Sequence, residues 1–313
     1  MISQEELIVF LKNNPALSVS TLAVEAGVPA STLRAAVSGS RQLNEKHLKS
    51  LYPILKKYGL VETPQNCKII AIVNHKGGTG KTTSAMNLGA GLAKLGKKVL
   101  LVDIDPQFNL TQHCGIREPE SSILQTFVDN DPLPIVEINE NLSLVPSELS
   151  LTRAETKLAA SVTSYMKLKN VLQEVQKDFH YILIDCPPSL SFFTTNAIIA
   201  ANSVIVALET EFLAKQGLDA ILDFIDEIRQ NGLNDRVSLL GVLLTKVNNT
   251  VMSRNVSEYV RKMLPKNTFK ATIRDNIALS EASAVGVNIH EYNSKSHGAE
   301  DYLTLSKEII QYG

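Results

Sequence analysis

The sequence has few cysteines, little net charge and no long hydrophobic run, and each of these absences narrows the class of protein. Its 313 residues include three cysteines, Cys67, Cys114 and Cys186, without paired spacing, so we expect no disulfide scaffold. The longest apolar runs are too short to span a bilayer, and the acidic start does not resemble a signal peptide. We therefore expect a globular protein of the reducing cytoplasm, without membrane attachment.

The near-zero net charge hides an uneven distribution along the chain. The 31 Lys and Arg residues almost balance the 32 Asp and Glu residues, leaving a net charge of −1. Residues 246–274, however, contain seven Lys or Arg residues and a single acid, Glu258. A basic stretch on an otherwise acidic chain predicts contact with a polyanion, and a solvated helix face is the alternative.

The pattern of the chain changes near residues 64–66. Residues 1–62 have the pattern of short helices, whereas strand-like apolar runs alternate with helical stretches in residues 67–313. The expected strands are 68–73, 98–103, 142–145, 181–185, 203–208 and 238–246. Nearly continuous Ile, Leu and Val in such runs is typical of strands that are buried on both faces. This pattern predicts an α/β fold with a mostly parallel twisted sheet flanked by helices, preceded by a small all-α domain.

A glycine-rich stretch follows the first expected strand and precedes a helical run. Glycines allow backbone N–H groups to surround a phosphate, and the helix that follows adds its N-terminal dipole. The residues expected to hold the nucleotide are Gly77, Gly78, Thr79, Gly80, Lys81, Thr82 and Thr83. Lys81 is expected to reach the β- and γ-phosphates and Thr82 to bind Mg²⁺, as in a P-loop NTPase.

A second lysine opens this glycine-rich stretch. The run Lys-Gly-Gly-Thr-Gly-Lys-Thr-Thr, which begins at Lys76, resembles the deviant Walker A motif of the ParA/MinD superfamily of ATPases. In that family the early lysine crosses a dimer interface and touches the phosphates bound to the partner. The resemblance therefore implies ATP and Mg²⁺ as cofactors, a homodimer that forms on ATP binding, and a catalytic role for Lys76.

Three aspartates stand at the ends of the second and fourth expected strands. Strand alternation places Asp103 and Asp105 on the same side of the chain, at the end of the sheet where ligands sit in open α/β folds. The run Asp-Ile-Asp-Pro-Gln resembles the family's switch I segment, which implies that Asp105 positions the hydrolytic water and that Asp103 supports Mg²⁺. Asp185, after a buried strand, resembles the Walker B acid. Phe108 stands where the family usually has Gly.

The resemblance continues to about residue 311 in unbroken order and is to the ParA subfamily of partition ATPases. It implies an interface segment at residues 211–217 and an adenine site at residues 245–248, to which we assign Thr245 and Asn248. It also implies a ParB-like or other adaptor partner.

Residues 253–264 have helical apolar spacing, with Arg254 and Arg261 together on the opposite face. Two arginines that the family often uses for DNA would fall on Thr250 and Ala278, so DNA binding is assigned here by charge alone. The expected phosphate contacts are Arg254, Arg261, Lys262, Lys266 and Lys270, with Arg274 beside them.

Residues 18–33 resemble a helix-turn-helix, with Gly27 in the turn. The second helix is expected to pack Leu33 and to direct Ser31, Thr32 and Arg34 into a DNA groove, with Arg41 following. A helical packing domain without DNA contact is the alternative for residues 1–62.

Taken together, the sequence predicts an ATP-dependent partition ATPase that dimerises, binds DNA on the nucleoid and acts with a ParB-like partner. Its helix-turn-helix is expected to give binding to an operator or centromere and autoregulation. Two alternatives stand beside this hypothesis: a transcriptional repressor that only senses ATP, and a MinD-like positioning ATPase.

Overall fold

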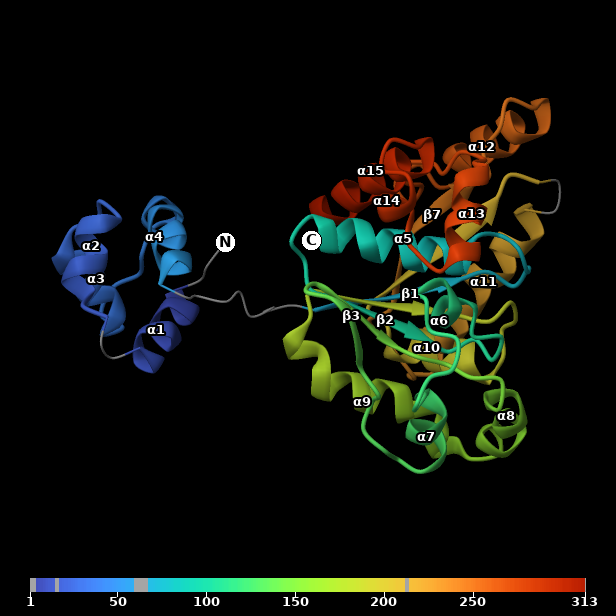
Figure 1. Cartoon of the computed structure of the whole chain (residues 1–313), viewed down its shortest axis with the longest axis horizontal. Coiled ribbons are helices and arrows are strands. Elements are labelled where there is room, and N and C mark those ends of the chain that lie inside the picture. The colour runs from blue at the N-terminus through green and yellow to red at the C-terminus, as the bar shows by residue number, and fades with distance from the viewer. Residues whose placement is uncertain (1–3, 15–16, 59–66, 212–213, 313) are drawn as a thin grey trace. The chain divides into compact units, whose positions relative to one another are not determined.

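The computed structural model describes residues 4–14, 17–58, 67–211 and 214–312. Within it the chain divides into two compact units, Met1–Thr63 and Pro64–Gly313. Each unit has its own hydrophobic core, and we describe the two separately (Figure 1).

The first unit is helical throughout its described residues. Its helices are α1 (Gln4–Asn13), α2 (Val19–Glu25), α3 (Ala30–Val37) and α4 (Glu45–Lys57). Leucines from all four helices, among them Leu7, Leu33 and Leu51, are fully buried in one core. Gly27 has a φ of +64° between α2 and α3, a left-handed conformation that glycine adopts at little cost.

The second unit is built on a seven-stranded sheet of order β3-β4-β2-β5-β1-β6-β7. The strands are β1 (Lys68–Val73), β2 (Val99–Asp103), β3 (Val136–Asn139), β4 (Leu142–Val145), β5 (Tyr181–Asp185), β6 (Ser203–Glu209) and β7 (Ser238–Thr245). All neighbouring pairs are parallel except the edge pair β3–β4. Six of these strands coincide closely with the expected runs, and β3 was not predicted.

Helices cover both faces of the sheet. They are α5 (Lys81–Lys94), α6 (Asn109–His113), α7 (Ile123–Val128), α8 (Leu151–Ala159), α9 (Lys167–Val175), α10 (Phe192–Ala200), α11 (Ala214–Gln230), α12 (Val251–Met263), α13 (Ile277–Val285), α14 (Ile289–Tyr292) and α15 (His297–Gln311). In Figure 1, α5, α14 and α15 lie on one side of the sheet and α7 and α9 on the other.

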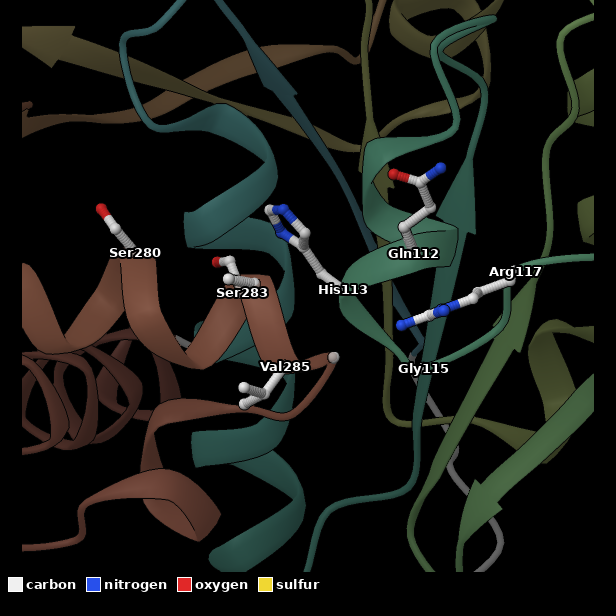
Figure 2. Close-up of a pocket in the computed structure, with 9 residues that line it drawn as sticks. Gln112, His113, Gly115, Arg117, Ser280, Ser283 and Val285 are labelled. Carbon is white, nitrogen blue, oxygen red and sulfur yellow. The ribbon is translucent and has the colours of Figure 1, made fainter.

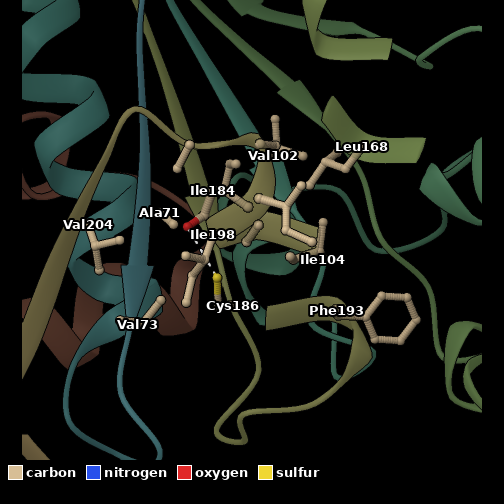
Figure 3. Close-up of a cluster of buried hydrophobic side chains, with 14 of the residues drawn as sticks. Ala71, Val73, Val102, Ile104, Leu168, Ile184, Cys186, Phe193, Ile198 and Val204 are labelled. Atoms are coloured by element: carbon tan, nitrogen blue, oxygen red, sulfur yellow. Dashed lines mark hydrogen bonds between the residues drawn. The ribbon is translucent and has the colours of Figure 1, made fainter. Parts of the chain in front are cut away.

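Alternation along the strands divides the interior into two hydrophobic cores. In β1, Ala71 and Val73 face the core formed with α7 to α11, whereas Ile70 and Ile72 face the core formed with α5 and α15. Figure 3 shows the first core, where Val102 and Ile184 from neighbouring strands pack with side chains of α9 and α10. Burial on both faces explains why these strands are continuously apolar.

Within the described residues, no helix combines the length and the apolar character that crossing a membrane would need. The glycine-rich loop and the aspartates predicted to bind the nucleotide lie at the carboxyl ends of β1, β2 and β5. This is the edge where ligands bind in open α/β sheets.

Candidate nucleotide site

The loop between β1 and α5 is shaped by glycines in left-handed conformation. Gly78 and Gly80 have φ values of +79° and +85°, and Gly80 immediately precedes the first residue of α5. The loop is anchored at its start because the Asn74 amide donates to Ala207 O at 2.7 Å while its Oδ1 accepts from Lys76 N at 3.0 Å. The backbone N–H groups at the start of α5 have no intrahelical partners, so this loop can bind a phosphate.

Lys81 lies inside this loop with only 6% of its surface exposed. Its Nζ donates to the Lys76 carbonyl oxygen at 3.1 Å, so the ammonium group lies within the loop that it is expected to serve. Burial lowers the pKa of Lys81, and the negative charges of Asp185 and Asp105 oppose that shift.

Two aspartates are fully buried on neighbouring strands. Asp103 of β2 and Asp185 of β5 are direct partners in the parallel register, so their carboxyl groups share the same sheet edge. Burial raises the pKa of Asp103 to about 7, with the charge of Asp105 adding to the shift and hydrogen bonds from Thr111 opposing it. Burial also raises the pKa of Asp185 well above its usual value, with the charge of Asp103 as the next cause.

The two carboxylates differ in their partners. Asp103 accepts from Asp105 N at 3.1 Å and from the Thr111 backbone and hydroxyl groups at 2.9 and 2.7 Å. These bonds show that Asp103 holds the loop after β2, and its expected support of Mg²⁺ stays a prediction. Both oxygens of Asp185 are buried without a well-formed hydrogen bond among the described residues, although the nearby Thr82 hydroxyl partly opposes the rise of its pKa. A buried carboxylate in this state fits a role as acceptor for water on a bound cation.

Mg²⁺ fits this site only as a nucleotide complex. Across the described residues, no group of three or more His, Cys, Asp or Glu side chains is arranged to hold a metal. Mg²⁺ is commonly held by one or two protein oxygens together with phosphates and water. The half-buried Thr82 hydroxyl beside Asp185 supplies a protein oxygen of this kind.

Asp105 lies in a tight loop that the neighbouring side chains fix. Its Oδ1 accepts from Gln107 N at 2.9 Å, and its carbonyl oxygen accepts from the Ser147 hydroxyl at 2.8 Å. Burial raises the pKa of Asp105, while the Gln107 hydrogen bond and the charge of Lys81 oppose the shift. Phe108 has a φ of +44°, which gives a physical reason for the family's preference for Gly at this position.

Lys76, at the start of the phosphate loop, pairs with acids of its own chain. Its Nζ forms an ion pair with Glu211 and lies 3.8 Å from Glu209 at the end of β6. Glu209 also pairs with Lys246 at 3.1 Å. The Glu211 hydrogen bond raises the pKa of Lys76, so the side chain stays charged. Nearly half of this side chain is exposed. Of the expected interface segment, Phe212 and Leu213 lie outside the described residues.

A small pocket adjoins the phosphate loop where the base was expected. Gly80, Thr83 and Thr245 line it, together with residues of α13. The Thr245 hydroxyl donates to Thr79 O at 2.8 Å, which joins the end of β7 to the loop. Asn248 is exposed and does not line this pocket. Its Oδ1 accepts hydrogen bonds from the Thr250 backbone and hydroxyl groups at 3.1 and 2.7 Å. Its assignment to the base stays a prediction.

The residues expected to bind DNA through charge fall into two groups. Arg254, Lys262, Lys266 and Lys270 are exposed. Arg261, by contrast, is half-buried and donates to the carbonyl oxygens of Phe269 and Lys270 at 3.0 and 3.4 Å, so it ties α12 to the chain that follows. Arg274 is also corrected: its guanidinium pairs with Asp301 and with Glu300, leaving little charge for a phosphate.

The N-terminal unit places α2 and α3 around the Gly27 turn as expected for a helix-turn-helix. Ser31, Arg34 and Arg41 are exposed, but Thr32 is only 8% exposed and packs into the unit instead of facing a groove. Arg34 donates to the Ser20 hydroxyl at 2.7 Å, which links α3 to α2. Thr32 therefore drops out of the expected groove contacts, and those of Ser31, Arg34 and Arg41 stay a prediction.

Residues 67–239 match the family described as an AAA domain. The sporulation initiation inhibitor protein Soj of Bacillus subtilis is 41% identical over 252 residues, which cover 79% of this chain and 99% of Soj. The chain belongs to the ParA/Soj family of P-loop ATPases.

Other members and neighbours of this ParA/Soj-family chain agree with that assignment. The chromosome partitioning protein ParA of Myxococcus xanthus is 37% identical over 78% of this chain and 88% of its own length. A crystal structure titled cobyrinic acid a,c-diamide synthase, from Mycobacterium smegmatis with bound ADP and magnesium, has a TM-score of 0.69 and 30% identity. It covers 79% of this chain and 95% of that one.

Several supporting residues of this ParA/Soj-family site were not predicted. Thr111 and Ser147 hold the Asp103–Asp105 loop, and Asn74 anchors the phosphate loop. His75 lies against Gly217 of α11 so closely that a Cβ there would be 2.1 Å from the ring. These are ordinary Thr, Ser, Asn and Gly residues whose roles depend on distant parts of the chain, and only the Asn next to the loop gave a local sequence signal.

Replacing Asp185 with Asn is expected to stabilise the nucleotide-free protein at pH 8. Three carboxylates, of Asp103, Asp105 and Asp185, surround one buried ammonium group, so removing a charge relieves repulsion and desolvation. We therefore expect the free energy of unfolding in urea to rise above that of the wild type. The exposed substitution Asp129→Asn serves as the control.

The gain should depend on pH with a definite sign. A raised carboxyl pKa means that the folded chain binds the proton more tightly than the unfolded chain, so the contribution of Asp185 to wild-type stability falls as pH rises above about 4. The difference between Asp185→Asn and wild type should therefore shrink toward acid pH. A variant that is less stable than wild type at pH 8 would contradict the electrostatic account.

Proposed function

We propose that this chain is an ATP-dependent, dimerising partition ATPase that binds DNA and segregates or positions plasmid or chromosomal DNA, or another cargo. The observation that carries the proposal is the phosphate loop with two lysines in different settings: Lys81 buried within the loop and Lys76 exposed outside it. Its cofactors are ATP and Mg²⁺. The partition names of Myxococcus xanthus ParA and other relatives support the same class of function.

The residues of the site divide the work of hydrolysis between them. Lys81 binds the phosphates, while Asp105 orients the attacking water from the loop that Asp103 and Thr111 hold. When bound, Mg²⁺ neutralises charge on the phosphates, with Thr82 as a protein ligand and Asp185 as an outer acceptor. The chain's own contribution is positioning and electrostatic stabilisation without a covalent step.

Dimerisation requires Lys76 to exchange partners. In the free chain its ammonium group is paired with Glu211 and approaches Glu209, and in the proposed dimer it reaches the phosphates bound to the second subunit. ATP then favours the dimer because the γ-phosphate offers Lys76 a stronger partner than an exposed carboxylate. A ParB-like partner is proposed to stimulate hydrolysis and release.

The DNA contacts proposed for the dimer are non-specific and electrostatic. Arg254, Lys262, Lys266 and Lys270 are the exposed cations available for phosphates around α12. The helix-turn-helix of the N-terminal unit is proposed to recognise a particular operator or centromere through Ser31, Arg34 and Arg41. That module also keeps a second candidate function open, a repressor that senses ATP without using hydrolysis, and multiple-turnover phosphate release in the presence of DNA and partner separates the two.

Asp105→Ala is expected to leave ATP binding intact and to reduce steady-state phosphate release by roughly a hundredfold, because the water loses its orienting carboxylate. Turnover is measured by phosphate release and binding by calorimetry. The exposed substitution Asp131→Ala is the control. Unchanged turnover in Asp105→Ala would remove that residue from the catalytic role.

Lys76→Ala and Glu211→Gln are expected to move dimerisation in opposite directions. Losing Lys76 removes the contact across the interface, whereas losing the Glu211 charge removes its competitor within the free chain. Light scattering with a slowly hydrolysed ATP analogue should show a weaker dimer for the first variant and a tighter one for the second. Glu137→Gln, on the exposed strand β3, is the control, and a weaker dimer in Glu211→Gln would contradict the exchange.

Arg254→Glu combined with Lys262→Glu is expected to weaken binding to random-sequence duplex and to flatten its salt dependence. Each lost phosphate contact lowers the slope of log affinity against log salt by about 0.9. The matched control is Arg153→Glu with Lys157→Glu on the exposed face of α8. An unchanged slope in the α12 variant, measured by fluorescence anisotropy with ATP and Mg²⁺, would move the DNA surface elsewhere.

A further inference from the structure

A pocket of about 600 Å³ lies between α6 and α13 (Figure 2). The residues lining it include Gln112, His113, Gly115 and Arg117 on one wall and Ser280 and Ser283 on the other. Its volume is in the range of pockets that bind metabolite-sized molecules. None of the sequence motifs predicted it.

The polar groups of the pocket favour an anion. Arg117 is exposed, and among the described residues no ion pair or hydrogen bond engages its guanidinium group. Figure 2 shows Arg117 turned back toward Gly115, at the end of α6. No Asp or Glu belongs to the lining, so nothing in the pocket neutralises this cation. A planar guanidinium group pairs in bidentate fashion with carboxylate or phosphate oxygens.

His113 adds a second unsatisfied group. Its side chain extends from α6 toward Ser283 of α13 (Figure 2), and its Nδ1 is buried without a hydrogen-bond partner among the described residues. Because Nδ1 has no partner, no hydrogen bond to that nitrogen fixes the ring, and the imidazole is available to a ligand as a wall of the pocket. Burial lowers the pKa of His113, so the ring is neutral at pH 7 and acts by hydrogen bonding.

The pocket is bounded by a close contact between two glycines. Gly115 and Gly286 have φ values of +81° and +75°, and a Cβ on Gly286 would lie 3.0 Å from the Gly115 Cα atom. The backbones that follow α6 and α13 therefore meet without side chains between them. The contact fixes the separation of the two walls, so the pocket exists before a ligand arrives.

Both walls lead directly to the nucleotide site. On α6, Thr111 holds the Asp103 carboxylate, one residue before Gln112 of the pocket. On α13, Ser280 lines both this pocket and the pocket beside the phosphate loop. A molecule seated between α6 and α13 would therefore bear on the loop of Asp105 and on the base pocket together.

We propose that this pocket binds a small organic anion, a carboxylate or phosphate monoester of metabolite size, through Arg117 and His113. The binding does not depend on the proposed partition function, since it concerns a separate surface of the same unit. Its position makes such an anion a candidate effector of the ATPase.

The test follows the ring C–H resonance of His113 by NMR in the full chain saturated with ADP and Mg²⁺, which keeps the phosphate loop occupied. Succinate and phenyl phosphate are titrated separately, as a dicarboxylate and a phosphate monoester. We expect a saturable shift of the His113 signal with at least one probe, and the responding probe identifies the anion class. The His47 signal of the N-terminal unit serves as the internal reference.

Two variants make the result specific. Arg117→Gln removes the cation and Ala284→Leu fills the pocket from the exposed surface of α13, and each should weaken the affinity by about tenfold or more. Arg153→Gln makes the same charge change on α8 and should leave the affinity unchanged. The proposal is overturned if neither probe gives saturation, or if the affinity in Arg117→Gln and Ala284→Leu stays at the wild-type value.

Discussion

The site depends on two carboxylates buried next to each other with too little positive charge around them. Asp103 and Asp185 are register partners on β2 and β5, and both are fully inaccessible. Asp103 is stabilised by hydrogen bonds from its own loop. Among the described residues, Asp185 has no well-formed hydrogen bond, and only the nearby Thr82 hydroxyl and the charge of Lys81 lower its pKa. An arrangement of this kind is costly in an empty protein and becomes favourable when a metal–nucleotide complex supplies the missing charge and hydrogen-bond donors. The buried carboxylates therefore destabilise the nucleotide-free protein, and binding of a metal–nucleotide complex removes that destabilisation.

The parallel sheet is what forces these groups together. Its strands are buried on both faces, so polar residues are excluded from their interiors and gather at the carboxyl ends, where β1, β2 and β5 lie side by side. The same edge carries the glycine-rich loop on β1, the Asp105 loop on β2 and Asp185 on β5. Because the strands are rigid and the loops are cross-linked by Asn74, Thr111 and Thr245, the site is held in position before nucleotide binds.

The parts of the fold and the site that could be predicted are those encoded by residues close together in the sequence. Buried strands, the glycine-rich loop and strand-end aspartates are read from a few consecutive residues, and these predictions match the observed elements closely. Strand β3 was missed because its residues are mostly exposed and carry no continuous apolar run. Arg261 and Arg274 were assigned to DNA on charge alone, whereas their partners, Phe269 O and Asp301, become neighbours only through tertiary folding. The pocket between α6 and α13 was beyond prediction for the same reason, since its walls come from segments more than 160 residues apart along the printed sequence.

Phe108 is a bulky residue in a left-handed backbone conformation, which glycine adopts more readily. A bulky residue in the left-handed region costs of order 1–3 kcal/mol, and such strain persists only where the surroundings enforce it. Here the enforcing contacts are those of the Asp105 loop on one side and α6 on the other, since Phe108 N donates to Asp105 O at 2.9 Å and Phe108 O accepts from Gln112 N at 3.1 Å. Phe108 therefore joins the Asp105 loop to α6 through two backbone hydrogen bonds. A molecule that fixed α6 against α13 would reinforce this connection, because the Asp105 loop and α6 are bonded to each other through Phe108.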